Sequence, residues 1–172
     1  MQRPQTEADL KRLLKMAYAS AQKGDYQAGL DICDFLIQGR DTEIAGLRER
    51  ADIKVLMGDI VGAIDDLEAI TSGQSREPAD LYLLGSLLIQ RGLMSDAIAA
   101  LTRTIEACAE TGSEYYLLPS YFLRAYAYLG SGQYERVMAD CIRLPDGYRA
   151  YVNGAGMWQK EDMAREALKG VT

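Results

Sequence analysis

Apolar residues recur every three to four positions along most of this 172-residue chain, the spacing of helices that bury one face. Short segments containing Gly interrupt this pattern. It predicts helices at residues 7–22, 26–38, 42–56, 60–72, 78–90, 94–110, 114–129 and 134–143. After Pro145-Asp146-Gly147 we expect two shorter helices at 148–152 and 160–169, with the glycine-rich segment 153–156 as a turn between them. The sequence therefore predicts an all-α protein.

A glycine motif repeats along the chain and divides the helices into pairs. Its glycines are spaced by 34, 34 and 40 residues, at Gly24, Gly58, Gly92 and Gly132. Small residues lie seven positions before each glycine, at Ala17, Ala51, Gly85 and Ala125. Small or short side chains also lie five positions after it, at Gly29, Ala63, Ala97 and Val137. We interpret each glycine as a left-handed turn between two helices, which cross closely at the small residues.

This motif resembles the tetratricopeptide repeat (TPR) family, whose 34-residue unit is a helical hairpin. The resemblance implies a right-handed α-solenoid in a single domain over residues 1–172. Its repeats would span about 10–43, 44–77, 78–117 and 118–147, followed by a helical cap at 148–172. The third repeat is six residues longer, which we interpret as a longer second helix through 106–113, and the segment 71–77 as a turn between repeats. The usual closing proline is absent.

The resemblance also implies a concave peptide-binding groove lined by the first helix of each repeat. The side chains expected to line it are aromatic or aliphatic with few charges: Lys11, Leu14, Tyr18, Arg48, Asp52, Val55, Tyr82, Ser86, Ile89, Phe122 and Tyr126. The alternative is that several of them pack against a neighbouring repeat or the cap. The Lys and Asn clamp by which some TPR domains bind a carboxyl terminus is not supported, because the first two repeats hold Leu14 with Tyr18 and Arg48 with Asp52 at those places.

Composition narrows the range of functions. The chain has 19 Lys and Arg, 25 Asp and Glu and no His, a net charge of −6 that argues against nucleic acid and anionic membranes. Without His, no Ser-His-Asp or Cys-His arrangement can form, so we expect no enzyme, no metal and no cofactor. Scattered cysteines and the lack of a signal peptide or membrane span indicate a cytoplasmic protein. Cys33 and Cys141 fall at predicted core positions.

Two further groups of residues allow more than one interpretation. Eight of the eleven tyrosines lie in the last third of the chain, where they suit either an interface or the helical core, and we assign Tyr128 and Tyr134 to the core. Trp158 is expected to pack under the cap. A basic patch of Arg40, Arg48, Arg50 and Lys54 is interleaved with acids, so we interpret it as a salt-bridged helix face.

We therefore predict a non-catalytic protein-binding module with an adaptor or scaffold role. Its ligand would be a partly apolar peptide or helix, and the negative charge of the chain favours a basic one. One alternative is a secretion-type chaperone for a client protein. The other is a homo-oligomeric structural subunit that associates through its tyrosine-rich end.

Overall fold

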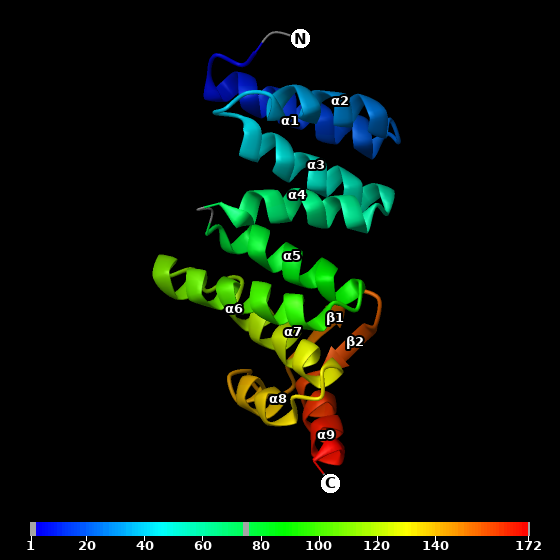
Figure 1. Cartoon of the computed structure of the whole chain (residues 1–172), viewed down its shortest axis with the longest axis vertical. Helices are drawn as coiled ribbons and strands as arrows, with labels where there is room; N and C mark the ends of the chain where they lie inside the picture. The colour runs from blue at the N-terminus through cyan, green and yellow to red at the C-terminus, as the bar shows by residue number, and fades with distance from the viewer. Residues whose placement is uncertain (1–2, 74–75, 172) are drawn as a thin grey trace. The chain divides into compact units, whose positions relative to one another are not determined.

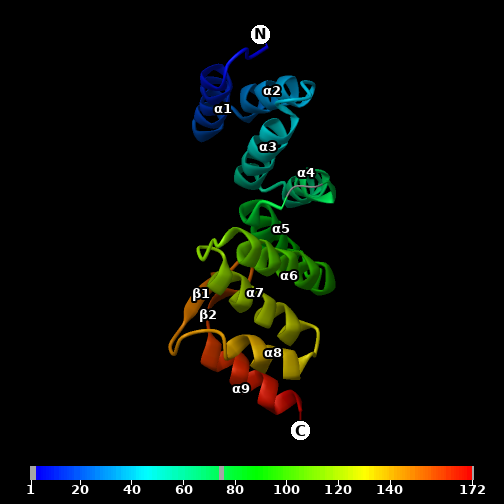
Figure 2. The same cartoon turned by 90° about the vertical axis from the view of Figure 1, so that its left-hand side faces the viewer.

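The structure, a computed structural model, describes residues 3–73 and 76–171 of the chain. Helices make up most of it, and a short pair of strands lies near the C-terminus (Figures 1 and 2). In chain order the elements are α1 (Glu7–Gln22), α2 (Tyr26–Ile37), α3 (Glu43–Met57), α4 (Ile60–Ser72), α5 (Pro78–Gln90), α6 (Met94–Thr111), α7 (Leu117–Gly130), α8 (Tyr134–Cys141), β1 (Arg149–Val152), β2 (Gly156–Gln159) and α9 (Lys160–Gly170).

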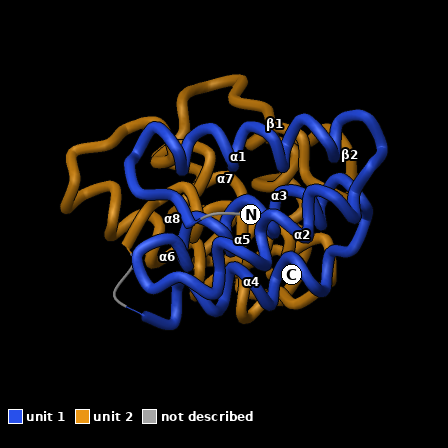
Figure 3. The backbone as a smooth tube through the Cα atoms, turned by 90° about the horizontal axis from the view of Figure 1, so that it is seen from above, with its two compact units in different colours: residues 1–75 blue, residues 76–172 orange. Residues whose placement is uncertain are grey.

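The elements group into two compact units, unit 1 (Met1–Ser75) and unit 2 (Arg76–Thr172), coloured separately in Figure 3. The boundary falls near the predicted junction of the second and third repeats. The turn predicted at 71–77 lies partly outside the described residues, and its first two residues belong to α4. That all four repeats form one domain over 1–172 stays a prediction.

Within each unit, helices that follow one another along the chain pack together. In unit 1, α1 packs on α2, α2 on α3 and α3 on α4, and the first helices of the two repeats, α1 and α3, also touch. In unit 2 the same order holds from α5 to α8, α5 touches α7, and α9 packs on both α7 and α8. This is the arrangement expected of stacked helical hairpins, and the predicted all-α helical-repeat fold is confirmed.

The turn glycines and the small residues behave as the repeat predicts. All four turn glycines have positive φ, between 71° and 83°. A Cβ at Gly29 would lie 2.9 Å from the carbonyl oxygen of Ala17, and one at Gly85 would lie 2.6 Å from Cγ of Leu101. The helices of a hairpin therefore approach too closely at these two crossings for a larger side chain.

The helix boundaries follow the prediction to within three residues. The largest difference is at α7, which begins at Leu117 and not at residue 114. The N–H of Leu117 donates a hydrogen bond to the carbonyl of Glu114, which closes a turn before the helix. The lengthened helix of the third repeat is confirmed, since α6 extends to Thr111 and ends where Gly112 takes a φ of 70°.

The helix predicted at 148–152 is wrong. Residues Arg149–Val152 form strand β1, which pairs antiparallel with β2 so that Ala150 lies opposite Trp158 and Tyr151 opposite Met157. Asn153-Gly154 begins the connection, and Gly154 has a φ of 81°. An Asn-Gly pair between two short apolar runs is a strong hairpin signal, which the search for helical periodicity passed over. The predicted turn at 153–156 is confirmed in its first part.

The C-terminal segment thus combines a β-hairpin with a helix. Helix α9 lies where a helix was predicted and buries Met163 and Ala167 against its neighbours. The base of the hairpin is tied to α9 by backbone and side-chain hydrogen bonds: the N–H of Lys160 donates to the carbonyl of Tyr148 at 2.9 Å, and the N–H of Gly147 donates to Oε1 of Glu161 at 2.9 Å.

Candidate functional site

The predicted groove residues of unit 1 lie on two adjacent helices. Lys11, Leu14 and Tyr18 share one face of α1 because they are spaced by three and four residues, and Arg48, Asp52 and Val55 do the same on α3. We call these six residues the α1–α3 face. Lys11 and Asp52 are exposed, Tyr18 is 46% exposed, and the other three are half-buried. This face offers a mixture of apolar, aromatic and charged groups to solvent.

The predicted groove residues of unit 2 lie on α5 and α7, and we call Tyr82, Ser86, Ile89, Phe122 and Tyr126 the α5–α7 face. Strand β1 packs against both helices. At the hairpin turn, Nδ2 of Asn153 donates a hydrogen bond to Oγ of Ser86 at 3.0 Å, and Gly154 lies against Gln90. Part of the α5–α7 face is therefore covered by the C-terminal segment of the same chain.

Aromatic rings make the other contacts between this segment and the α5–α7 face. The ring of Trp158 meets that of Tyr126 edge-on with centroids 5.2 Å apart, and the ring of Tyr148 lies 5.4 Å from that of Phe122. Phe122 is fully buried and Ile89 is 5% exposed. These two side chains cannot reach a ligand in this conformation. Trp158 packs on α7 from strand β2, not from beneath a helix.

A further aromatic cluster lies at the start of α7. Tyr116 stacks on Tyr82 of the α5–α7 face with centroids 5.3 Å apart, and Tyr115 meets Tyr116 edge-on at 4.8 Å. Tyr115 is strongly exposed, whereas Tyr82 and Tyr116 are half-buried. Burial raises the pKa of Tyr82 and Tyr116 above the usual value. Both hydroxyls therefore stay protonated at neutral pH. Of the two tyrosines assigned to the core from the sequence, Tyr128 is buried and Tyr134 is half-buried.

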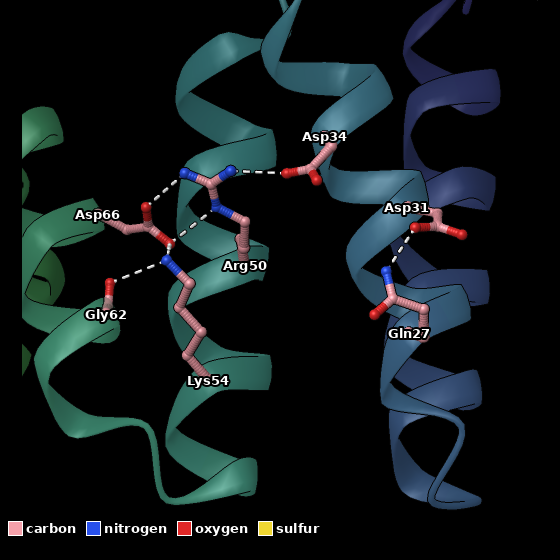
Figure 4. A network of polar contacts seen from close by, with 7 residues as sticks. All are labelled: Gln27, Asp31, Asp34, Arg50, Lys54, Gly62 and Asp66. Carbon is pink, nitrogen blue, oxygen red and sulfur yellow. Dashed lines mark hydrogen bonds and ion pairs between the residues drawn. The ribbon is translucent and has the colours of Figure 1, made fainter.

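The predicted salt bridges of α3 are confirmed for Arg50 and Lys54, whose acidic partners lie on α2 and α4 (Figure 4). Arg50 donates from Nε and Nη2 to the two oxygens of Asp66 on α4, at 3.0 and 2.6 Å, and from Nη1 to Asp34 on α2 at 2.6 Å. Nζ of Lys54 lies 2.8 Å from Oδ2 of Asp66 and also donates a hydrogen bond to the carbonyl of Gly62. The hydrogen bonds to Asp66 and Asp34 raise the pKa of Arg50.

Glu49 lies on α3 next to Arg50, and unlike the residues of this network it has a buried side-chain oxygen that is not hydrogen-bonded within the described part of the chain. Its Oε1 atom is buried and has no hydrogen-bond partner among the described residues. Burial, together with the negative charge of Asp52, raises the pKa of Glu49 to about 7. A carboxyl group in this environment is partly neutral near pH 7.

Unit 2 repeats the ion pair at the equivalent place. Arg124 donates from Nε and Nη2 to the two oxygens of Asp140 at 2.8 and 2.7 Å, and from Nη1 to Oγ1 of Thr102 at 3.0 Å. In both units the arginine lies eight residues before the turn glycine and the aspartate eight residues after it. The sequence carried this signal, but Arg50 was considered only with the other basic residues of its helix.

The cysteines and the acidic side chains are further candidates for reactive or metal-binding groups. All three cysteines are buried and free, which confirms Cys33 and Cys141 as small core residues, and burial raises the pKa of Cys33 to about 12. Within residues 3–73 and 76–171 there is no group of three or more Cys, Asp and Glu side chains placed to share a metal ion. Over the same ranges, no helix has both the length and the apolar character needed to cross a bilayer.

Stacked hairpins with tight glycine turns define the chain as an α-helical repeat protein. No family model matches it. A zebrafish (Danio rerio) relative, tetratricopeptide repeat protein 36, is 28% identical over 151 residues, which cover 83% of this chain and 76% of the relative. The predicted resemblance to the TPR family is confirmed.

Solved structures support the same fold. The nearly identical TPR-like repeats of a kinesin light chain candidate from Podosopora anserina superpose with a TM-score of 0.67 at 16% identity, covering 98% of this chain and 89% of that one. The MamA protein superposes with a TM-score of 0.68 at 17% identity, covering 94% and 87%. A TPR-like fold generally serves as a scaffold for protein–protein interaction.

Proposed function

We propose that this chain is a non-catalytic protein-binding module that takes a partly apolar peptide or helix on its α1–α3 face and acts as an adaptor or scaffold. The helical-repeat fold supports the class of function, because stacked hairpins present extended surfaces made from the first helix of each repeat. The single observation that carries the choice of surface is the exposure of Tyr18, 46% of which is open to solvent beside the apolar side chains of Leu14 and Val55.

The chemistry of the α1–α3 face favours a ligand with both apolar and basic groups. Tyrosine and aliphatic side chains bury area at a small cost in conformational entropy, which suits the apolar residues of an amphipathic peptide. The chain carries a net charge of −6, which favours a basic side chain on the ligand.

Affinity capture with quantitative mass spectrometry tests this proposal. The wild-type chain is compared with a Tyr18→Ala/Val55→Ala variant and with the control Val61→Ala, which truncates a side chain of similar exposure on α4. Losing two contacts from a binding centre should weaken capture by about thirtyfold, or about 2 kcal/mol. The control should capture the partner like wild type.

Equal capture by all three folded proteins would show that the partner does not bind the α1–α3 face. If capture depends on this face, the half-life of the partner in cells lacking the chain separates an adaptor, whose partner persists, from a chaperone, whose client is degraded. A mass that rises with protein concentration in light scattering would instead identify a self-associating subunit.

A further inference from the structure

The C-terminal hairpin is attached to unit 2 in two different ways along its length. At its base, Nζ of Lys160 donates to the carbonyl of Leu144 at 2.9 Å and to Oδ1 of Asp146 at 2.7 Å, and the backbone of Lys160 bonds Tyr148. The base is therefore held by several hydrogen bonds that involve no residue of α5 or α7. The turn of the hairpin, in contrast, is held by the α5–α7 face itself.

The hairpin strands and turn make few contacts of this kind with the α5–α7 face. At the turn, one side-chain hydrogen bond joins Asn153 to Ser86, and on β2, opposite Ala150, the ring of Trp158 meets that of Tyr126 edge-on. Val152 is fully buried, whereas Tyr151 and Met157 on the opposite side of the hairpin are more than 60% exposed. A two-stranded hairpin of four residues per strand is marginal by itself, so these contacts decide whether the turn stays on the helices.

Glycines flank the hairpin at the points where it could bend. Gly147 precedes it with a φ of 70°, and Gly154 and Gly156 at the turn have φ of 81° and 89°. Gly147 also lies between Asp146 and Tyr148, which are two of the residues hydrogen-bonded to Lys160. The turn can thus move away from α5 while the base stays attached to α9, because glycine adopts these and other backbone conformations at little cost.

The residues of the hairpin also show what the α5–α7 face accepts. Extended backbone packs on it, an amide side chain bonds Ser86, a β-branched side chain is buried, and aromatic rings contact Tyr126 and Phe122. This is the chemistry of an extended peptide with alternating apolar positions and one amide group.

We propose that the α5–α7 face is a second peptide-binding surface, occupied in this structure by the chain's own hairpin. Its partner is an extended segment of the same chemistry as residues 147–159: an aromatic residue, a β-branched residue and an amide at the hairpin spacing. Such a segment displaces the turn and both strands of the hairpin from α5 and α7, while Lys160 keeps its hydrogen bonds to Leu144 and Asp146. The inference rests on the proposed protein-binding role but concerns unit 2, so the Tyr18 experiment in unit 1 can fail or succeed independently of it.

Trp158 gives a direct test, because it is the single Trp of the chain and reports on the contact with Tyr126. The probe is a synthetic peptide of residues 147–159 with Trp158 replaced by Phe, titrated into the full-length chain. We expect a saturable red shift of the Trp158 emission as strand β2 leaves Tyr126 of α7. In the Asn153→Ala chain, which lacks the bond to Ser86, half-saturation should come at a peptide concentration lower by on the order of fivefold.

Two controls keep the outcome specific. The Tyr151→Ala chain changes the solvent side of the same strand and should titrate like wild type. A peptide of scrambled sequence should leave the emission unchanged. The proposal is overturned if the emission does not move in either the wild-type or the Asn153→Ala chain, if the scrambled peptide acts equally well, or if a shift comes only with loss of the far-ultraviolet helical signal.

Discussion

The two ion pairs at equivalent repeat positions have different surroundings. Both pairs are bidentate: Arg50 donates to the two carboxylate oxygens of Asp66 in unit 1, and Arg124 donates to those of Asp140 in unit 2. Around Arg50 the other groups of the network are charged: Asp34 also accepts from Arg50, and Lys54 shares Asp66 with it. Around Arg124 they are neutral: Thr102 accepts a hydrogen bond, and the rings of Tyr121 and Tyr128 lie 5.6 and 5.7 Å from the guanidinium carbon.

The other two repeats show that the hairpin does not require an ion pair. The equivalent positions hold Met16 and Ile32 in the first repeat and Leu84 and Ala100 in the third. A buried pair often contributes no more to stability than well-packed apolar side chains, but removing one partner leaves a charge without compensation. The difference between the units therefore predicts how each responds when one charge is removed.

Replacing the aspartates should have the largest effect, and it should be greater in unit 1. Asp66→Ala leaves both Arg50 and Lys54 without their buried acid, whereas Asp140→Ala leaves only Arg124, which keeps Thr102 and the tyrosine rings. We expect a loss of about 3–5 kcal/mol for Asp66→Ala and about 2 kcal/mol for Asp140→Ala. Thermal unfolding followed by circular dichroism measures both.

Two additions make this comparison sharper. Trp158 fluorescence follows unit 2 alone, so the Asp66→Ala variant should alter the circular-dichroism transition more than the fluorescence transition if the units unfold separately. The double variant Arg50→Met/Asp66→Ile copies the first repeat and should recover most of the lost stability. A larger loss for Asp140→Ala than for Asp66→Ala would contradict the interpretation.

The helices could be predicted because the repeat fixes them locally. The spacing of Gly24, Gly58, Gly92 and Gly132 marks every hairpin turn, and small residues mark the crossings, so the elements follow from short-range patterns. The prediction for residues 148–152 was wrong because a five-residue segment with four apolar residues fits a helix and a strand equally well, and only the Asn153-Gly154 pair distinguishes the two.

The candidate surfaces were predicted only in part. The six residues of the α1–α3 face lie on the two helices to which the register assigned them. That the α5–α7 face would be covered depends on contacts such as the bond between Ser86 and Asn153, which are 67 residues apart. No local pattern reports a contact at that separation. The two ion pairs could have been predicted from the sequence, because their symmetric spacing about the turn glycine occurs in two of the four repeats.

Glu49 should make the stability of unit 1 depend on pH in a way that has no counterpart around Arg124. Its pKa is raised from 4.5 to about 7, chiefly by burial, so the folded chain favours the neutral carboxyl. Its stabilising contribution is complete below pH 4.5 and is lost as the pH rises through about 7. Glu49→Gln should therefore raise stability at about pH 8 by about 1–2 kcal/mol, allowing for solvent screening, and change it little at about pH 5.

Unfolding by urea at the two pH values measures this effect. Glu43→Gln, an exposed change on the same helix, is the matched control and should show no comparable gain at high pH. Equal effects of Glu49→Gln at both pH values would mean that the carboxyl is not held in its neutral form by the fold.

The smallest effect concerns the third hydrogen bond of each arginine, where the two units differ by one charge. Nη1 of Arg50 donates to Asp34, whose side chain is half exposed, and Nη1 of Arg124 donates to the neutral Thr102. Asp34→Ala should cost about 0.2–1 kcal/mol, and the cost should shrink as salt is added because solvent ions screen an exposed charge. Thr102→Val should cost about 0.5–1.5 kcal/mol at every salt concentration, because no charge is removed. Urea unfolding of both variants at low and high salt measures the difference. A salt-dependent cost for Thr102→Val, or a constant one for Asp34→Ala, would show that the surroundings of the two arginines are electrostatically alike.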